Sequence, residues 1–148
     1  MKKDNIRDYA TEAFRFYARM GKPSHETLKA QYMAEAMKEY GKVHEKGGGE
    51  LGRPTEAALM YAERQVQRKE AELLDILAVE KVYHAAQKDA REIIEIVYFE
   101  TPDKPLKKGE ISGRVLKASL FTFNSERSVY SILKACRTAF AIERKLRL

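Results

Sequence analysis

Residues 109–148 read GEISGRVLKASLFTFNSERSVYSILKACRTAFAIERKLRL, and the interpretation of the whole chain starts from this stretch. Its second half carries one apolar stripe at positions i, i+3, i+4, i+7 and i+11, formed by Val129, Ile132, Leu133, Cys136 and Phe140. This spacing predicts an amphipathic helix from Ser125 to about Lys145. Ser125 is a good N-cap, because its hydroxyl can accept a hydrogen bond from the backbone N–H of Ser128.

A shorter helix is predicted immediately upstream, over residues 109–119, where Ile111, Val115 and Leu116 form a smaller apolar stripe. The connector between the two helices is Leu120–Asn124. This arrangement is typical of a helix-turn-helix, in which the second helix places its N-terminal residues in the DNA major groove. Two amphipathic helices with a short connector also occur in all-α proteins that bind no DNA, so the pattern alone leaves both interpretations open.

If the pattern is a helix-turn-helix, two sets of side chains are expected at the DNA. The exposed face of the second helix would meet bases or nearby phosphates through Ser125, Arg127, Ser128, Tyr130, Ser131 and Lys134. Flanking phosphates would be held by Lys107, Lys108, Arg114 and Lys117. Contacts of the second kind position a protein on DNA without reading its sequence.

The distribution of charge favours a polyanionic partner. The 148 residues carry a net charge of +6. Residues 104–148 hold 11 Lys or Arg and 3 Glu, a net +8, whereas the other 103 residues hold 17 basic and 19 acidic side chains, a net −2. The basic character therefore belongs to the last third of the chain, as expected of a surface that neutralises phosphates. A basic helix on an anionic membrane is the weaker interpretation, because the apolar stripe is needed for packing.

Several classes of protein are disfavoured by composition. No apolar run approaches the roughly 18 residues that a membrane span needs, and the N-terminus lacks the apolar core of a secretory signal, so we expect no membrane association and a cytoplasmic location. Cys136 is the single cysteine and lies on the core stripe. The histidines (His25, His44 and His84) are scattered. We expect no metal, no cofactor and no enzymatic activity.

The remainder of the chain predicts an all-α fold with four parts. Residues 1–40 are expected to form an N-terminal helical hairpin with caps at Asp4 and Ser24, and residues 41–54 a flexible, glycine-rich linker. Residues 55–81 would be a central helix and residues 82–148 a three-helix DNA-binding domain, with residues 90–99 as its packing helix. The helical pattern runs without Pro or Gly from Thr55 to Phe99, so it either breaks, which we expect near Ala78–Lys81, or stays whole and forms a homodimer as a coiled coil.

These residues also resemble a known family. The segment Ala90–Phe99, followed by Glu110-Ile111 and by Ser125-Glu126-Arg127-Ser128-Val129-Tyr130, is similar to region 4 of bacterial sigma factors. It departs from that pattern at Gly113 and Arg114 and in the longer connector Leu120–Asn124, which lacks the usual turn glycine. No segment resembles the sigma region that melts promoter DNA. Size and layout are similar to the small phage-encoded regulators of the RinA/ArpU type, which implies promoter binding as a transcriptional regulator and RNA polymerase as a further partner.

Two other functions remain open at this stage. A phage small terminase-like packaging protein would use the same DNA-binding helices and assemble a ring through the central helix. A helical adaptor would bind an acidic protein through its basic end. The first expectation remains a sequence-specific regulator of double-stranded DNA.

Overall fold

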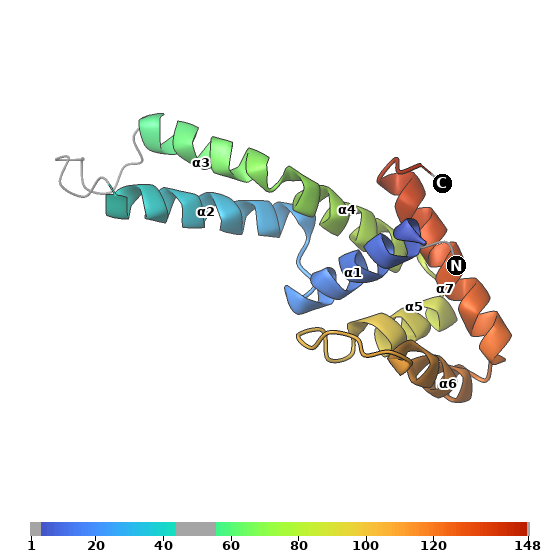
Figure 1. Cartoon of the computed structure of the whole chain (residues 1–148). Helices are drawn as coiled ribbons and strands as arrows, with labels where there is room; N and C mark the ends of the chain where they lie inside the picture. Colours follow the sequence, from blue (N-terminus) through green and yellow to red (C-terminus); the bar gives the residue numbers. More distant parts are fainter. Residues whose placement is uncertain (1–3, 44–55, 148) are drawn as a thin grey trace. The chain divides into compact units, whose positions relative to one another are not determined.

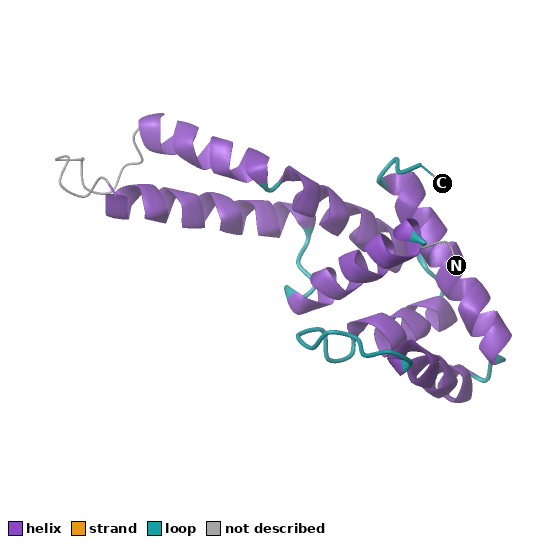
Figure 2. Cartoon of the chain, viewed as in Figure 1, coloured by secondary structure: helices purple, strands orange, loops and turns teal. Residues whose placement is uncertain are grey.

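The computed structural model describes residues 4–43 and 56–147, and all regular structure within them is helical (Figure 2). The all-α expectation is therefore confirmed for this part of the chain. The elements in order are α1 (Asn5–Arg19), α2 (His25–Val43), α3 (Glu56–Arg68), α4 (Glu70–Ala85), α5 (Lys88–Ile94), the π-helical segment η1 (Glu95–Phe99), α6 (Glu110–Thr122) and α7 (Glu126–Glu143). No helix of the described ranges is both long enough and apolar enough to span a membrane.

Local sequence signals set both ends of α1 and the start of α2, and the caps at Asp4 and Ser24 are as expected. The Asp4 side chain accepts a hydrogen bond from the Arg7 backbone N–H at 2.9 Å and caps α1. The Ser24 hydroxyl accepts from the Thr27 N–H at 3.1 Å at the start of α2. After α1, Gly21 adopts a φ of +85°, a left-handed conformation that glycine reaches without steric cost.

The described residues divide into two compact units, which differ from the four expected parts. One unit contains α1 together with the chain from Asp75 onward, and the other spans Pro23–Leu74. The expected hairpin over residues 1–40 is therefore wrong, because its two helices belong to different units. Figure 1 shows α2 running beside α3, the helix with which it shares its packing.

The second unit is a two-helix arrangement that continues into the start of α4. Leu28 and Ala36 of α2 and Ala58 and Ala62 of α3 are buried. The Tyr32 hydroxyl donates to Glu72 at 2.9 Å. Of the expected linker 41–54, the first three residues belong to α2, and the remainder lies outside the described residues, as does the expected cap Thr55.

The long helical pattern breaks twice, and neither break lies near Ala78–Lys81, where one break was expected. The breaks fall at Lys69 and at Ala86–Gln87, whereas Ala78 and Val79 are buried inside an unbroken α4. Lys69 lies in a polar stretch between Val66 and Leu73, where the chain has no apolar side chain larger than alanine to hold a straight helix against a core. The second break has no such signal, since Ala85-Ala86-Gln87 favours helix.

The first unit is built around the inner face of α1. Phe14 and Tyr17 are buried, and the Phe14 ring stacks on Tyr98 of η1 with centroids 5.4 Å apart. Phe140 of α7 packs against Phe14 at 6.0 Å. The N-terminal helix therefore completes the core of the unit that contains α6 and α7, which the expected boundary at residue 82 left out.

Two buried arginines satisfy the carbonyl end of η1. Arg15 of α1, 2% exposed, donates to the carbonyl oxygens of Tyr98 (3.0 Å), Glu100 (3.3 Å), Thr101 (2.8 Å) and Lys104 (2.6 Å). Arg114 of α6 donates to the carbonyls of Val97 (3.1 Å) and Glu100 (2.8 Å) and to the Thr101 hydroxyl (2.7 Å). A helix end leaves carbonyls without partners, and cations there also interact favourably with the helix dipole.

Replacing Arg15 by leucine should destabilise the first unit severely. Arg15→Leu leaves several buried carbonyls without a donor, and each costs roughly 1–3 kcal/mol, so the free energy of unfolding should fall by about 3 kcal/mol or more. Chemical denaturation measures this loss. Arg7→Leu, on the exposed side of the same helix, is the matched control and should change stability by about 0.5 kcal/mol or less. Equal effects of the two substitutions would show that Arg15 does not stabilise the fold in this way.

Candidate nucleic-acid interface

Helix α7 is amphipathic in the way the sequence predicts. Its stripe is buried at Val129, Leu133, Cys136 and Phe140, and Ile132 is half-buried. Burial raises the pKa of the Cys136 thiol, consistent with a residue that serves as part of the core. The helix starts at the predicted place: the Ser125 hydroxyl accepts a hydrogen bond from the Ser128 N–H at 3.1 Å.

The connection between α6 and α7 is shorter than expected. Leu120, Phe121 and Thr122 belong to α6, so only Phe123, Asn124 and Ser125 separate the two helices. Phe123 takes the left-handed conformation that a glycine would usually supply, with φ 59° and ψ 30°, and its side chain is 96% exposed.

Side chains around this turn hold it in place. The Asn124 side-chain amide donates to the Thr122 hydroxyl at 2.9 Å and to the Asp89 carboxylate at 3.3 Å. The Ser119 hydroxyl donates to the Asn124 carbonyl. Asp89 lies in α5, so the turn is tied to the helix that packs against both α6 and α7.

The polar face of α7 begins immediately after this turn. The six predicted contact residues are all exposed: Ser125, Arg127, Ser128, Tyr130, Ser131 and Lys134. Within residues 4–43 and 56–147, the side chains of Arg127 and Lys134 make neither an ion pair nor a hydrogen bond. Ser125 and Ser128 differ from the others, because the Ser125 hydroxyl accepts from the Ser128 N–H as the cap of α7 and donates to the Ser128 hydroxyl at 3.1 Å.

The four predicted phosphate contacts have different surroundings. Lys107 and Lys108 have exposed side chains before α6. The Lys117 ammonium is exposed but forms an ion pair with Glu100 at 2.8 Å. The structure contradicts the role predicted for Arg114, because this residue is 9% exposed and its guanidinium is bound to the end of η1. The sequence places Arg114 on a basic helix, but the direction of its side chain depends on the tertiary packing of η1.

Two hydrogen bonds between Lys107 and Glu110 form a turn at the start of α6. The Lys107 backbone N–H donates to the Glu110 carboxylate at 3.0 Å, and the Glu110 N–H donates to the Lys107 carbonyl at 3.0 Å. Gly109 inside this turn has a φ of +82°, which explains glycine there. The Lys107 N–H holds the pKa of the Glu110 carboxyl below its usual range, and the positive charges of Arg114 and Arg15 act in the same direction, against partial burial.

Comparison with protein-family models, curated protein sequences and solved structures finds no match to this chain. The geometry of the surface around α7 is therefore the basis for any functional assignment. Among the residues described, no group of three or more His, Cys, Asp or Glu side chains is arranged to hold a metal ion.

Replacing Phe123 by glycine should stabilise the turn. Phe123→Gly removes the Cβ strain of a left-handed residue, and the exposed ring loses almost no packing, so the free energy of unfolding should rise by roughly 0.5–1 kcal/mol. Phe121→Gly is the matched control, because the same exchange within α6 should lower stability by about 0.5–1 kcal/mol. Thermal or denaturant unfolding of both variants checks the opposite signs, and a loss of stability in Phe123→Gly would contradict the assigned strain.

Glu110 should make stability sensitive to acid. A carboxyl whose folded pKa is depressed contributes stability above its unfolded pKa of about 4.3, and that contribution is lost as the pH falls through the folded value. The difference in unfolding free energy between wild type and Glu110→Gln should therefore be constant above about pH 5 and shrink below about pH 4. Denaturation across pH 3–7 measures the difference. A gap that stays unchanged down to pH 3 would contradict the depressed pKa.

Proposed function

We propose that the chain is a sequence-specific regulator of transcription that binds double-stranded DNA and reads the major groove with the first half of α7. The observation that carries this proposal is the uncovered polar face of α7, with Arg127 and Lys134 exposed and unpaired among the described residues. A solvated basic face also occurs in proteins without a nucleic-acid partner. Here it follows a three-residue turn and a bracing helix, the order in which a helix-turn-helix presents its recognition helix.

The packing around α7 supports the proposal. The helices α5, α6 and α7 contact one another in all three pairs, as the three helices of such a domain must. The buried stripe fixes the rotation of α7 about its axis, and this leaves Arg127, Ser131 and Lys134 at the solvent side. A rigid helix with a defined outward face is what direct reading of base edges requires.

The surroundings of each residue define its proposed role. Arg127 and Lys134 are assigned to base edges or groove phosphates, with Ser128, Tyr130 and Ser131 beside them. Lys107 and Lys108 are assigned to flanking phosphates, and Lys117 joins them if its pair with Glu100 opens. Arg114 is withdrawn from the interface. Ser125 acts through the helix start that it caps.

Part of the positive charge in the last third of the chain is not available to a partner. Two of its eleven basic residues are internal: Arg114 is buried at η1, and Arg144 donates to Asp75 at 2.6 Å in a largely buried pair. The charge available to a polyanion is therefore smaller than the sequence count of +8 suggests. The nine other basic residues lie in the loop before α6, in α6, along α7 and after it: Lys104, Lys107, Lys108, Lys117, Arg127, Lys134, Arg137, Lys145 and Arg147.

A packaging protein of the small terminase type is the second candidate. The observation that favours it is the two-helix unit Pro23–Leu74, which keeps large apolar side chains exposed at Leu59 (38%), Met60 (49%) and Leu74 (38%). Exposed apolar residues on a small helical unit favour assembly with further copies. The homodimer expected through the central helix stays a prediction, and it would have to use these residues, because Ala58 and Ala62 are already buried. The mass in solution distinguishes a ring from a monomer or dimer.

Substitutions should distinguish residues that recognise the base sequence from residues that contact phosphates. After duplexes that bind wild type are selected from a random pool, Arg127→Ala should weaken the selected duplex by roughly 1–3 kcal/mol and relax the preference at one base pair, because a bidentate contact to guanine is lost. Lys108→Ala should weaken all sequences alike and reduce the slope of log K against log salt by about 1. Fluorescence anisotropy over a salt series measures both quantities.

Wild type itself provides the decisive controls for this function. Equal binding of the selected and a scrambled duplex would remove the claim of sequence specificity. No binding of any duplex at low salt would remove DNA as the partner and favour an acidic protein at the same surface. RNA polymerase as a partner is tested separately, by transcription from a template that carries the selected site.

A further inference from the structure

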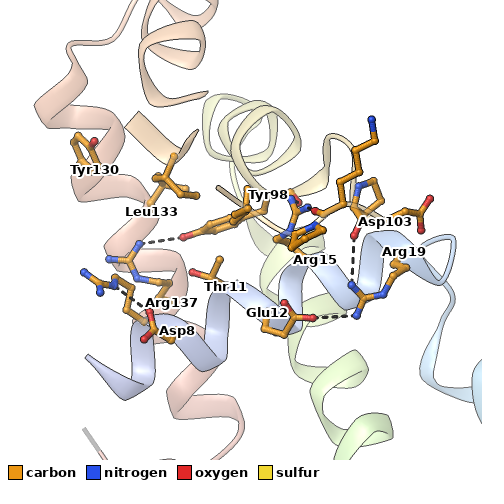
Figure 3. Close-up of a pocket in the computed structure, with 16 residues that line it drawn as sticks. Asp8, Thr11, Glu12, Arg15, Arg19, Tyr98, Asp103, Tyr130, Leu133 and Arg137 are labelled. Carbon is orange, nitrogen blue, oxygen red and sulfur yellow. Dashed lines mark hydrogen bonds and ion pairs between the residues drawn. The ribbon is translucent and has the colours of Figure 1, made fainter. Parts of the chain in front are cut away.

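A polar groove borders the reading face of α7 within the first unit. It encloses about 720 Å3 and is lined by α1, by the loop over residues 102–106 and by one side of α7. Figure 3 shows the three contributions: Asp8, Glu12 and Arg19 from α1, Asp103 from the loop, and Tyr130 and Arg137 from α7. Of the cations that line it, Arg137 alone lies in the segment that the helix-turn-helix pattern covers.

The groove carries an excess of positive charge. Its lining has five cations and three carboxylates, a net +2: Arg7, Arg15, Arg19, Lys104 and Arg137 against Asp8, Glu12 and Asp103. Arg15 is committed to the end of η1. Arg7 and Arg19 are paired with Asp8 (3.4 Å) and Glu12 (3.0 Å), but these pairs are 37–64% exposed and therefore weak enough to exchange for another anion.

Besides Arg15, two of the cations have no carboxylate partner among the residues described. Lys104 uses its carbonyl to accept from Arg15, while its side chain is exposed. Arg137 donates one N–H to the Tyr98 hydroxyl at 3.0 Å. That single bond orients the guanidinium and leaves its other donors available to a ligand.

The groove is continuous with the proposed reading face. Tyr130, Leu133 and Arg137 are spaced i, i+3 and i+7 and line the groove from one side of α7. Leu133 is buried there, whereas Tyr130 is 44% exposed and also belongs to the reading face. The groove therefore adjoins the face of α7 that we assign to the major groove.

The spacing of the cations fits a strand better than a small anion. Arg7 and Arg19 are twelve residues apart on α1, which corresponds to roughly 18 Å at 1.5 Å per residue. One strand of DNA presents a phosphate about every 3.4 Å along the helix axis, so several phosphates fall within that length. A small organic acid could reach only one end of the row.

We propose that this groove receives the phosphate backbone of the DNA strand beside the major groove, with Arg7, Lys104 and Arg137 as its principal phosphate contacts. This inference rests on the proposed function and extends it, because it adds the outer face of α1 to the DNA-binding surface. Arg137 is oriented for this contact by Tyr98, and Arg19 supplies a further charge at the far end of α1.

The triple substitution Arg7→Gln/Lys104→Gln/Arg137→Gln tests the inference through the salt dependence of binding. Each lost phosphate contact lowers the slope of log K against log salt by about 0.9, so the triple variant should lose roughly 2–3 from the wild-type slope and weaken selected and scrambled duplexes alike. Lys29→Gln/Lys38→Gln/Arg64→Gln, with the same loss of charge in α2 and α3, should keep the wild-type slope. Thermal melting confirms that both variants are folded.

The outcomes separate this inference from the function on which it rests. If wild type binds no duplex, the proposed function fails and the groove proposal fails with it. Only the groove proposal is overturned if wild type binds DNA and Lys108→Ala lowers the slope, but the triple variant does not lower it. The groove proposal is also overturned if citrate raises the melting temperature of wild type but not of the triple variant while their DNA slopes are equal, because the groove would then be a small-anion site.

Discussion

The first unit depends on one constraint, which is the need to satisfy the carbonyl oxygens at the buried end of η1. A buried backbone carbonyl without a donor costs free energy, and the chain after η1 turns away at Thr101 with a φ of +45°, so it cannot continue the helical bonds itself. Arg15 of α1 and Arg114 of α6 supply the donors, and these two residues are 99 positions apart in the sequence. Two like charges are held near each other for this purpose: burial lowers the pKa of Arg15, and the positive charge of Arg114 lowers it further.

This arrangement determines where α7 can lie. The Tyr98 ring stacks on Phe14, and its hydroxyl accepts from Arg137, so the end of η1 is connected to the middle of α7. At the far end of α7, Arg144 and the Tyr9 hydroxyl both donate to Asp75, which joins α7, α1 and α4. With its axis fixed at two points, α7 has one outward face, and the exposure of Arg127 follows from contacts that lie on the opposite side of the helix.

The parts of this structure that depend on local rules could be predicted from the sequence. The caps at Asp4, Ser24 and Ser125 and the apolar stripe of α7 follow from hydrogen bonding and periodicity within a few residues. The partner of each helix could not be predicted in this way. Arg114 was expected at DNA because a basic residue on an exposed-looking helix is usually solvated, and no short-range pattern indicates that carbonyls of η1 lie beside it. The role of Arg15 could not be predicted for the same reason. It also explains why α1 was assigned to a hairpin with α2.

The two faces of α1 hold their positive charges in different surroundings. Its inner face carries an arginine that is as buried as the core around it, and its outer face carries Arg7 and Arg19 on the same helix. The net charge of α1 is only +1, because Asp8 and Glu12 lie between Arg7 and Arg19 and pair with them. Exposed pairs of this kind contribute little to stability, so a phosphate can replace the carboxylate at small cost. A surface that is nearly neutral by composition can therefore still bind a polyanion, provided that its cations lie in a row and an adjoining helix brings the strand to them.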